Sequence, residues 1–187
     1  ALEFLESCGI PDDAEKTITL AAGLYNEKLE VNIPNLTIIG AGTGETAYSM
    51  IEWDSLFGER DESGYVHTTD STSTLNIREK AVGFTMKNVI VSNYFNCKEH
   101  FDERMGEGFS EHRALAMLVQ ADKVTVENCT LLGYQDTLEL FTGRHVFKNC
   151  LIEGVTDFIF GSNGTTYFTG CEIRQIRHVK ANQGGYM

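Results

Sequence analysis

The sequence predicts an all-β protein built as a solenoid of parallel β-strands. Three observations lead to this fold class. They are an internal repeat of 21 residues, an alternation of apolar and polar side chains within short segments, and a composition rich in Gly (18) and poor in Pro (2). The chain has 187 residues, 42% of them hydrophobic, so we expect a single domain over residues 1–187 with its own core.

The repeat is clearest in "VENCTLLGYQD", which begins at Val126, and "FKNCLIEGVTD", which begins at Phe147. Four residue types recur at an offset of 21 in these segments: Asn128 and Asn149, Cys129 and Cys150, Gly133 and Gly154, Asp136 and Asp157. The segments at 33–42 and 84–93 are similar to them. In a parallel solenoid such equivalent residues stack on successive coils, about 4.7–4.9 Å apart.

Three cysteines follow the same period, at Cys129, Cys150 and Cys171. The pattern predicts a column of small core side chains along the interior. The interstrand spacing also falls in the range of about 4.4–6.8 Å that a disulfide requires between Cα atoms, so a bond between coils stays open as an alternative.

The period also stacks Asp136 against Asp157. Two carboxylates about 5 Å apart do not both ionise at low cost, so one keeps its proton more readily than the other. Such a pair divides the roles of acid and nucleophile in a catalytic site. A column of aspartates satisfied by turn amides or by calcium is the structural alternative.

Two segments interrupt the repeat, near 45–74 and near 98–112, and we expect loop insertions that lie beside the coils and wall a cleft. His112 borders the predicted site, and a solvent-exposed imidazole is the simpler expectation for it.

Composition excludes several classes of function. The net charge of −12 argues against nucleic acid as a partner, and no apolar run is long enough to span a membrane. The start of the chain lacks the pattern of a signal peptide. No HExxH, CxxC or GxSxG motif occurs, so we expect neither a metal site nor a serine esterase.

The segments "GYQDTL" and "EGVTDFIFG" resemble the two signature segments of pectin methylesterases, and "AAGLYNEKLEV" and "GRHVFKNCLIEG" are similar to other stretches of that family. The resemblance implies a right-handed parallel β-helix and an extracellular enzyme without a cofactor. It also implies that the enzyme hydrolyses the C6 methyl esters of homogalacturonan (pectin) and releases methanol. The sequence does not predict an oligomeric state.

The same resemblance implies the roles of individual residues. Asp157 would be the nucleophile, Asp136 the general acid and then base, and Gln135 a donor to the oxyanion. Phe160 would pack on a sugar ring, although a core position is the structural alternative.

The sequence departs from the family pattern near these residues. Arg113 stands where the family has a second oxyanion glutamine, Thr156 replaces a valine before the nucleophile, and Glu139 replaces an aromatic residue. All three are expected to contact substrate, and Arg113 would oppose protonation of Asp136 unless it pairs with Glu111 instead.

The family's L-G-R-P-W segment, whose arginine pairs with the nucleophile, is missing from these 187 residues. The chain therefore resembles the first and middle parts of a longer esterase or a shortened homologue. Two other functions stay open: a pectin-binding β-helix with impaired catalysis, and a β-helix hydrolase or lyase that acts on polygalacturonate.

Overall fold

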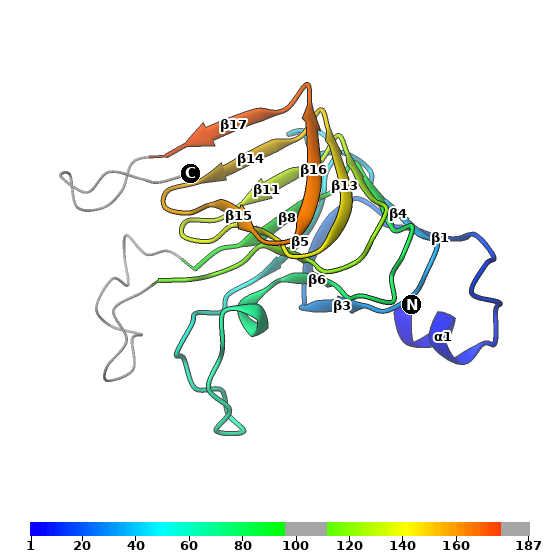
Figure 1. Cartoon of the computed structure of the whole chain (residues 1–187), viewed down its shortest axis with the longest axis horizontal. Helices are drawn as coiled ribbons and strands as arrows, with labels where there is room; N and C mark the ends of the chain where they lie inside the picture. Colours follow the sequence, from blue (N-terminus) through cyan, green and yellow to red (C-terminus); the bar gives the residue numbers. More distant parts are fainter. Residues whose placement is uncertain (96–111, 177–187) are drawn as a thin grey trace.

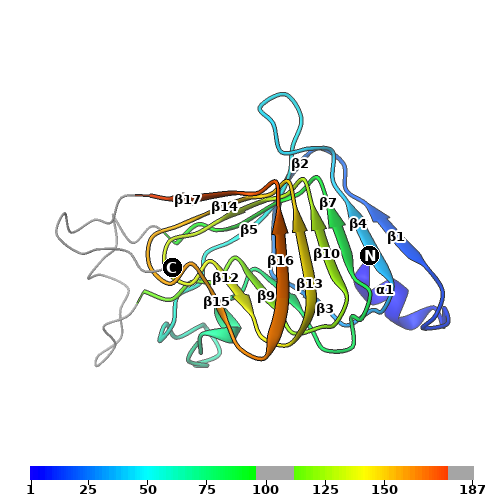
Figure 2. The ribbon, with the colours of Figure 1, turned by 45° about the horizontal axis from the view of Figure 1, so that its top comes forward.

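The computed structural model describes residues 1–95 and 112–176, which form a parallel β-helix (Figure 1). Each coil contributes one strand to each of three parallel sheets, called here sheets A, B and C, except that the last described coil has strands in sheets A and B alone. Figure 2 shows the strands of sheet A side by side in the order β1, β4, β7, β10, β13 and β16. Chain order and stacking order therefore agree, as a solenoid requires.

The three sheets contain all the strands of the described residues. Sheet A comprises β1 (Lys16–Thr19), β4 (Leu36–Ile39), β7 (Thr85–Lys87), β10 (Val124–Glu127), β13 (Gly143–Lys148) and β16 (Gly164–Thr169). Sheet B comprises β2 (Gly23–Asn26), β5 (Ser49–Trp53), β8 (Ile90–Asn93), β11 (Thr130–Leu132), β14 (Leu151–Gly154) and β17 (Glu172–Gln175). Sheet C comprises β3 (Leu29–Val31), β6 (Leu75–Ile77), β9 (Met117–Val119), β12 (Leu138–Leu140) and β15 (Ile159–Gly161).

Register in the later coils follows the sequence period. Val124 pairs with His145, and His145 pairs with Thr166, in steps of 21 residues. The inward-facing apolar side chains of all three sheets meet in one continuous core. The short helix α1 (Leu2–Ser7) lies at the N-terminal end, where Leu2 and Leu5 pack against this core.

A column of asparagines forms the corner between sheets A and B. Asn88, Asn128 and Asn149 all adopt a left-handed backbone conformation, with φ between 53° and 57°. Asn128 donates to the side-chain oxygen of Asn88 and Asn149 donates to that of Asn128, both at 3.4 Å. Asparagine tolerates this conformation better than most residues, which explains why the repeat places it there.

The cysteine column lies inside the coil, and the thiols of Cys129, Cys150 and Cys171 are free. The backbone N–H of Cys150 donates to Cys171 Sγ at 3.4 Å. Burial raises the pKa of Cys129 to about 12 and that of Cys150 to about 11. The core interpretation is confirmed for these three residues, and the disulfide alternative is wrong for them.

The prediction of a loop near 45–74 is wrong in part, because Ser49–Trp53 forms β5 in the middle of sheet B. After β5 the chain leaves the coil and returns through the 3-10 helix η1 (Asp70–Thr72) to β6. The segment predicted near 98–112 lies outside the described residues except for His112. In the part of the chain that the structure describes, no helix has the length and apolar character needed to cross a membrane.

Candidate active site

The candidate site lies at the turns that lead from sheet B to sheet C. Gln135 and Asp136 occupy the turn between β11 and β12, and Thr156 and Asp157 occupy the equivalent turn one coil further on. Isolated parallel bridges join Arg113 to Gln135 and Gln135 to Thr156. The backbone N–H of Asp136 donates to the Thr156 carbonyl at 3.1 Å. This register places the two aspartates at matching positions of adjacent coils, as the period predicts.

Both aspartates have a left-handed backbone, with φ of +63° at Asp136 and +46° at Asp157. Non-glycine residues held in this region carry strain, and such residues cluster in functional sites. The two turns are therefore the same local structure made twice, and each presents a carboxylate from the same backbone geometry. Their surroundings differ, because Asp136 is only 5% exposed whereas Asp157 is exposed to solvent.

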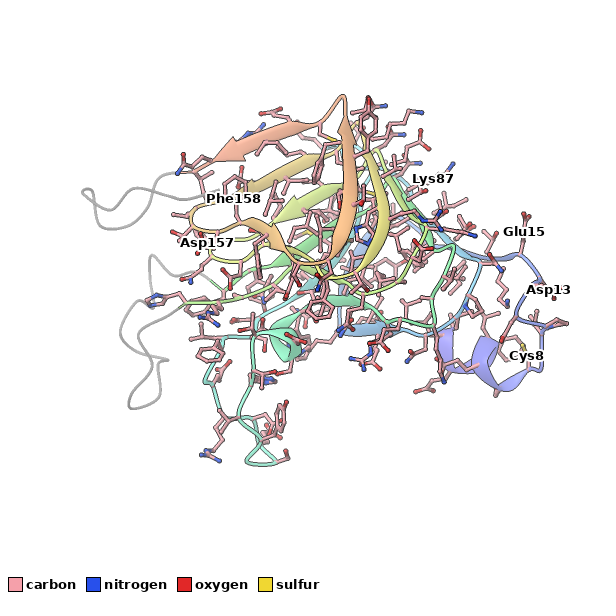
Figure 3. All side chains as sticks on the ribbon, viewed as in Figure 1. Cys8, Asp13, Glu15, Lys87, Asp157 and Phe158 are labelled. Carbon is pink, nitrogen blue, oxygen red and sulfur yellow. The ribbon has the colours of Figure 1, made fainter. Side chains whose placement is uncertain are left out.

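The segment "TDFIFG" places the carboxylate of Asp157 next to three large apolar residues, and the structure shows where each of these side chains lies. Asp157 and Phe158 are both labelled in Figure 3 at the β14–β15 turn. Phe158 is fully buried and Ile159 packs against the core. Phe160 is neither fully buried nor packed against the core. Phe160 instead lines a surface hollow beside Leu140, Gly161 and Ser162. The core alternative for Phe160 is therefore wrong.

Arg113 points toward the aspartate pair. Its Nε lies 3.8 Å from Asp136 Oδ2, and its Nη1 donates to Thr69 Oγ1 at 3.2 Å. The guanidinium carbon lies 5.2 Å from the centre of the Phe57 ring. A guanidinium beside a buried carboxylate favours its ionised form. Arg113 is therefore within ion-pair distance of Asp136, and the alternative partner expected for it, Glu111, lies outside the described residues.

Gln135 is oriented by the preceding coil. The backbone N–H of His112 donates to Gln135 Oε1 at 3.1 Å, so the amide oxygen is engaged and the nitrogen end is the donor. His112 itself is only 7% exposed, and its ring stacks on Phe95 at 6.3 Å between centroids. The prediction of a solvent-exposed His112 is therefore wrong.

Glu139 belongs to what we call the outer face of sheet C, the side away from the core. In register it pairs with Phe160 on β15 and with Leu118 on β9. Glu139 is partly buried, and burial together with the negative charge of Asp70 raises its pKa to about 7, although the charge of Arg113 acts in the opposite direction. Among the described residues, Glu139 Oε2 is a buried acceptor without a hydrogen-bond partner.

Sequence reasoning missed the residue that holds these segments together. Asn93, at the end of β8, is 1% exposed, and its Nδ2 donates to the carbonyls of Ser55, Thr72 and Leu115. Its Oδ1 accepts from the backbone N–H of Phe95. Asn93 thus ties the chain after β5 and the last residue of η1 to the coil that carries Arg113. A single asparagine at the end of a strand gives no sequence signal for such a role.

Neither a metal nor a cofactor was expected, and within residues 1–95 and 112–176 no three His, Cys, Asp or Glu residues gather into a possible metal site. Separately, two carboxyl groups at matching positions of adjacent coils, an amide donor and a guanidinium are residue types that can carry out acyl transfer, with one carboxylate as nucleophile and the other as proton donor.

Comparison with known proteins identifies the family. A family model described as Pectinesterase matches residues 6–185. The chain belongs to the pectinesterase family. Probable pectinesterase A of Neosartorya fischeri is 32% identical over 164 residues, which are 87% of this chain and 45% of that relative. Probable pectinesterase 49 of Arabidopsis thaliana is 33% identical over 154 residues, which are 81% of this chain and 37% of that relative.

Solved structures of pectin methylesterases share the fold of this chain. The enzyme from Yersinia enterocolitica aligns with a TM-score of 0.80 and 29% identity, over 94% of this chain and 55% of that one. A pectin methylesterase variant in complex with a hexasaccharide also aligns with a TM-score of 0.80, at 26% identity, over 94% of this chain and 51% of that one. The predicted right-handed parallel β-helix is confirmed. The chain spans about half the length of these proteins or less.

Proposed function

We propose that this pectinesterase chain carries the acyl-transfer site of a pectin methylesterase. Asp157 is the nucleophile, Asp136 the acid and then base, and Gln135 the oxyanion donor. The observation that carries the proposal is the register of Gln135 with Thr156, which sets the two aspartate turns side by side in the same left-handed conformation. The substrate class follows from the names of the relatives and of the solved structures.

The proposed reaction has two steps. A carboxylate oxygen of Asp157 attacks the C6 carbonyl carbon, Gln135 Nε2 donates to the oxyanion, and the bond to methoxide breaks as Asp136 gives it a proton. Methanol leaves, and Asp157 is joined to the uronate as a mixed anhydride. Water then attacks the anhydride while the Asp136 carboxylate takes its proton, which frees the galacturonate carboxylate and restores both aspartates.

The exposure of the two aspartates supports this division of roles. Asp157 is exposed, so an incoming ester can reach its carboxylate, whereas Asp136 is buried beside it and needs to exchange only a proton. We also propose that Phe160, on the strand that follows the Asp157 turn, packs on a sugar ring, and that Thr156, Arg113 and Glu139 contact the substrate as well. Because pectin is a polysaccharide of plant cell walls, we also propose that the protein acts outside the cell.

Methanol release from highly esterified pectin tests the proposal. We expect Asp157→Asn and Asp136→Asn each to lower the rate by at least about a hundredfold, and Gln135→Leu to lower kcat by about ten- to a hundredfold. Asp13→Asn is the matched control, since Asp13 is exposed and lies at the opposite end of the coil (Figure 3). Absence of methanol release by the native chain, or full activity in Asp157→Asn, overturns the proposal.

A pectin-binding protein without turnover is the second candidate, and the Arg113–Asp136 ion pair favours it. An ionised Asp136 has no proton to give to methoxide, so the ion pair opposes the first step. Binding of oligogalacturonides by the native chain without methanol release would support this candidate. Cleavage of the polysaccharide chain would instead support a hydrolase or a lyase.

A further inference from the structure

The outer face of sheet A carries little negative charge, although the chain as a whole has a net charge of −12. Glu127 is the only acidic residue in the six strands that the structure describes for this sheet. Two lysines from the neighbouring strands bind its carboxylate, with Lys87 Nζ at 3.3 Å and Lys148 Nζ at 2.8 Å. Because two cations face one anion, this part of the face has a net positive charge.

A surface hollow of about 400 Å3 lies on the same face, where β10, β13 and β16 run side by side (Figure 2). We call it the sheet A hollow, and the side chains that matter for its chemistry are Lys123, Thr125, Arg144, Val146, Thr165 and Tyr167. Tyr167 is 65% exposed, and it pairs in register with Val146 on β13. An aromatic ring therefore stands open to solvent beside an apolar side chain.

Two cations belong to the sheet A hollow. Arg144 is held by Asp122, whose Oδ1 accepts a hydrogen bond from Arg144 Nε at 2.9 Å, yet its side chain stays 65% exposed. Lys123 is exposed and makes no ion pair within the part of the chain that the structure describes. Its charge is therefore available to an anionic ligand.

This combination of groups fits an acidic sugar. The exposed ring of Tyr167 offers a flat apolar surface for a pyranose, and the hydroxyls of Thr125 and Thr165 can exchange hydrogen bonds with sugar hydroxyls. The ammonium of Lys123 can pair with a carboxylate. A methyl-esterified sugar has no carboxylate for that ammonium. A galacturonate from which the ester has been removed therefore matches the sheet A hollow better than the esterified sugar does.

The sheet A hollow is separate from the candidate active site. The aspartate turns lead from sheet B to sheet C, and none of the residues that line the hollow belongs to these turns. Figure 3 labels Lys87 of β7 and Asp157 on opposite sides of the coil. A ligand in the hollow thus leaves the aspartate pair free.

We propose that the sheet A hollow binds de-esterified galacturonan, the product of the proposed reaction, and holds the protein on pectin that has already lost esters. Tyr167 packs on a sugar ring, and Lys123 pairs with the carboxylate of that sugar. The identity of the ligand rests on the proposed function, whereas the binding itself can be measured without turnover. Because a second site on the same chain raises the effective concentration of substrate, this anchoring favours repeated reaction near the bound segment.

Isothermal titration calorimetry with a fully de-esterified oligogalacturonate at low salt tests the binding. We expect Tyr167→Ala and Lys123→Gln each to raise Kd about three- to tenfold, and added salt to weaken binding by the native chain. Lys80→Gln is the matched control, because Lys80 is an exposed cation that does not line the sheet A hollow. Its Kd should stay within about twofold of the native value. A Kd of Tyr167→Ala or of Lys123→Gln that is equally close to native overturns the proposal.

Amide chemical shifts locate the bound oligogalacturonate. Changes on β13 and β16 place it in the sheet A hollow, whereas changes confined to the turns of Gln135 and Asp157 would place it at the candidate active site and overturn the proposal. Two ligands test its chemistry, since polyglutamate has the charge without the sugar and a fully methyl-esterified oligomer has the sugar without the charge. Binding of either one as tightly as oligogalacturonate also overturns it.

Methanol release from highly esterified pectin keeps the two proposals apart. Tyr167→Ala should retain the kcat of the native chain, because Tyr167 lies outside the proposed catalytic residues. If the native chain releases no methanol, the proposed function fails, and the Kd values still decide whether the sheet A hollow binds galacturonate.

Discussion

Gly154 ends β14 immediately before the turn that carries Asp157, and its replacement by alanine tests how tightly this turn is packed. A Cβ atom at Gly154 would lie 2.2 Å from Phe158 Cβ, 2.6 Å from Phe158 Cγ and 2.7 Å from Thr137 Oγ1. Phe158 and Thr137 are both fully buried, so neither has space to move away. The repeated glycine of the 21-residue period therefore leaves room for the side chain four residues ahead.

The size of the effect follows from this geometry. Overpacking a filled core costs about 1–3 kcal/mol, and contacts this short with a buried ring belong at the upper end of that range. We therefore expect Gly154→Ala to lower the free energy of unfolding by about 3 kcal/mol. For a chain of this size this corresponds to a Tm about 6–12 °C lower. Because Phe158 follows Asp157 directly, the same displacement should also lower any methanol release.

Urea and thermal unfolding followed by circular dichroism measure the change. Gly44→Ala is the matched control, because Gly44 is exposed and a Cβ there would have no atom within 4 Å. The control should stay within about 0.5 kcal/mol of the native chain. A Gly154→Ala variant that is equally close to native would refute the packing argument for the repeated glycine.

Three further predictions concern the asparagine column, Glu139 and the thiols. Asn149→Ala should lower the free energy of unfolding by about 1–2 kcal/mol, because φ is +53° at this position and the hydrogen bond to Asn128 is lost. Asn149→Gly should lower the free energy of unfolding by less than half as much. Urea unfolding measures both changes. The pKa of Glu139 is raised from 4.5 to about 7, so the folded state holds a proton that the unfolded chain has released. The free energy of unfolding should therefore fall by about 1 kcal/mol, after allowance for solvent screening, as pH rises from about 4.5 to about 7. Glu139→Gln should remove this pH dependence from the free energy of unfolding measured across that range. Cys129 and Cys150 should resist alkylation by iodoacetamide at pH 8, whereas the exposed Cys8 should react. Peptide mass spectrometry detects the labelled residues. Equal labelling of all three cysteines would contradict the burial of Cys129 and Cys150.

Some features of this chain could not be read from local sequence patterns. Ser49–Trp53 joins sheet B although a long excursion follows it before β6 of the same coil, so no regular period marks it. His112 is buried by a ring contact with Phe95. The step from Arg113 to Gln135 is 22 residues, not 21, so the repeat alone does not align them.

The sequence by itself determined the coil and the pairing of its two aspartates. Parallel hydrogen bonding allows one register per coil, so residues 21 apart stack, and asparagine and aspartate tolerate the left-handed corners that the turns need. The tertiary structure alone decided the charges around that pair. Arg113 forms an ion pair with Asp136, and the negative charge of Asp70 on η1 acts on Glu139, because the fold brings together segments that are far apart in the chain. Long-range electrostatics of this kind depends on distances through space, which no repeat in the sequence encodes.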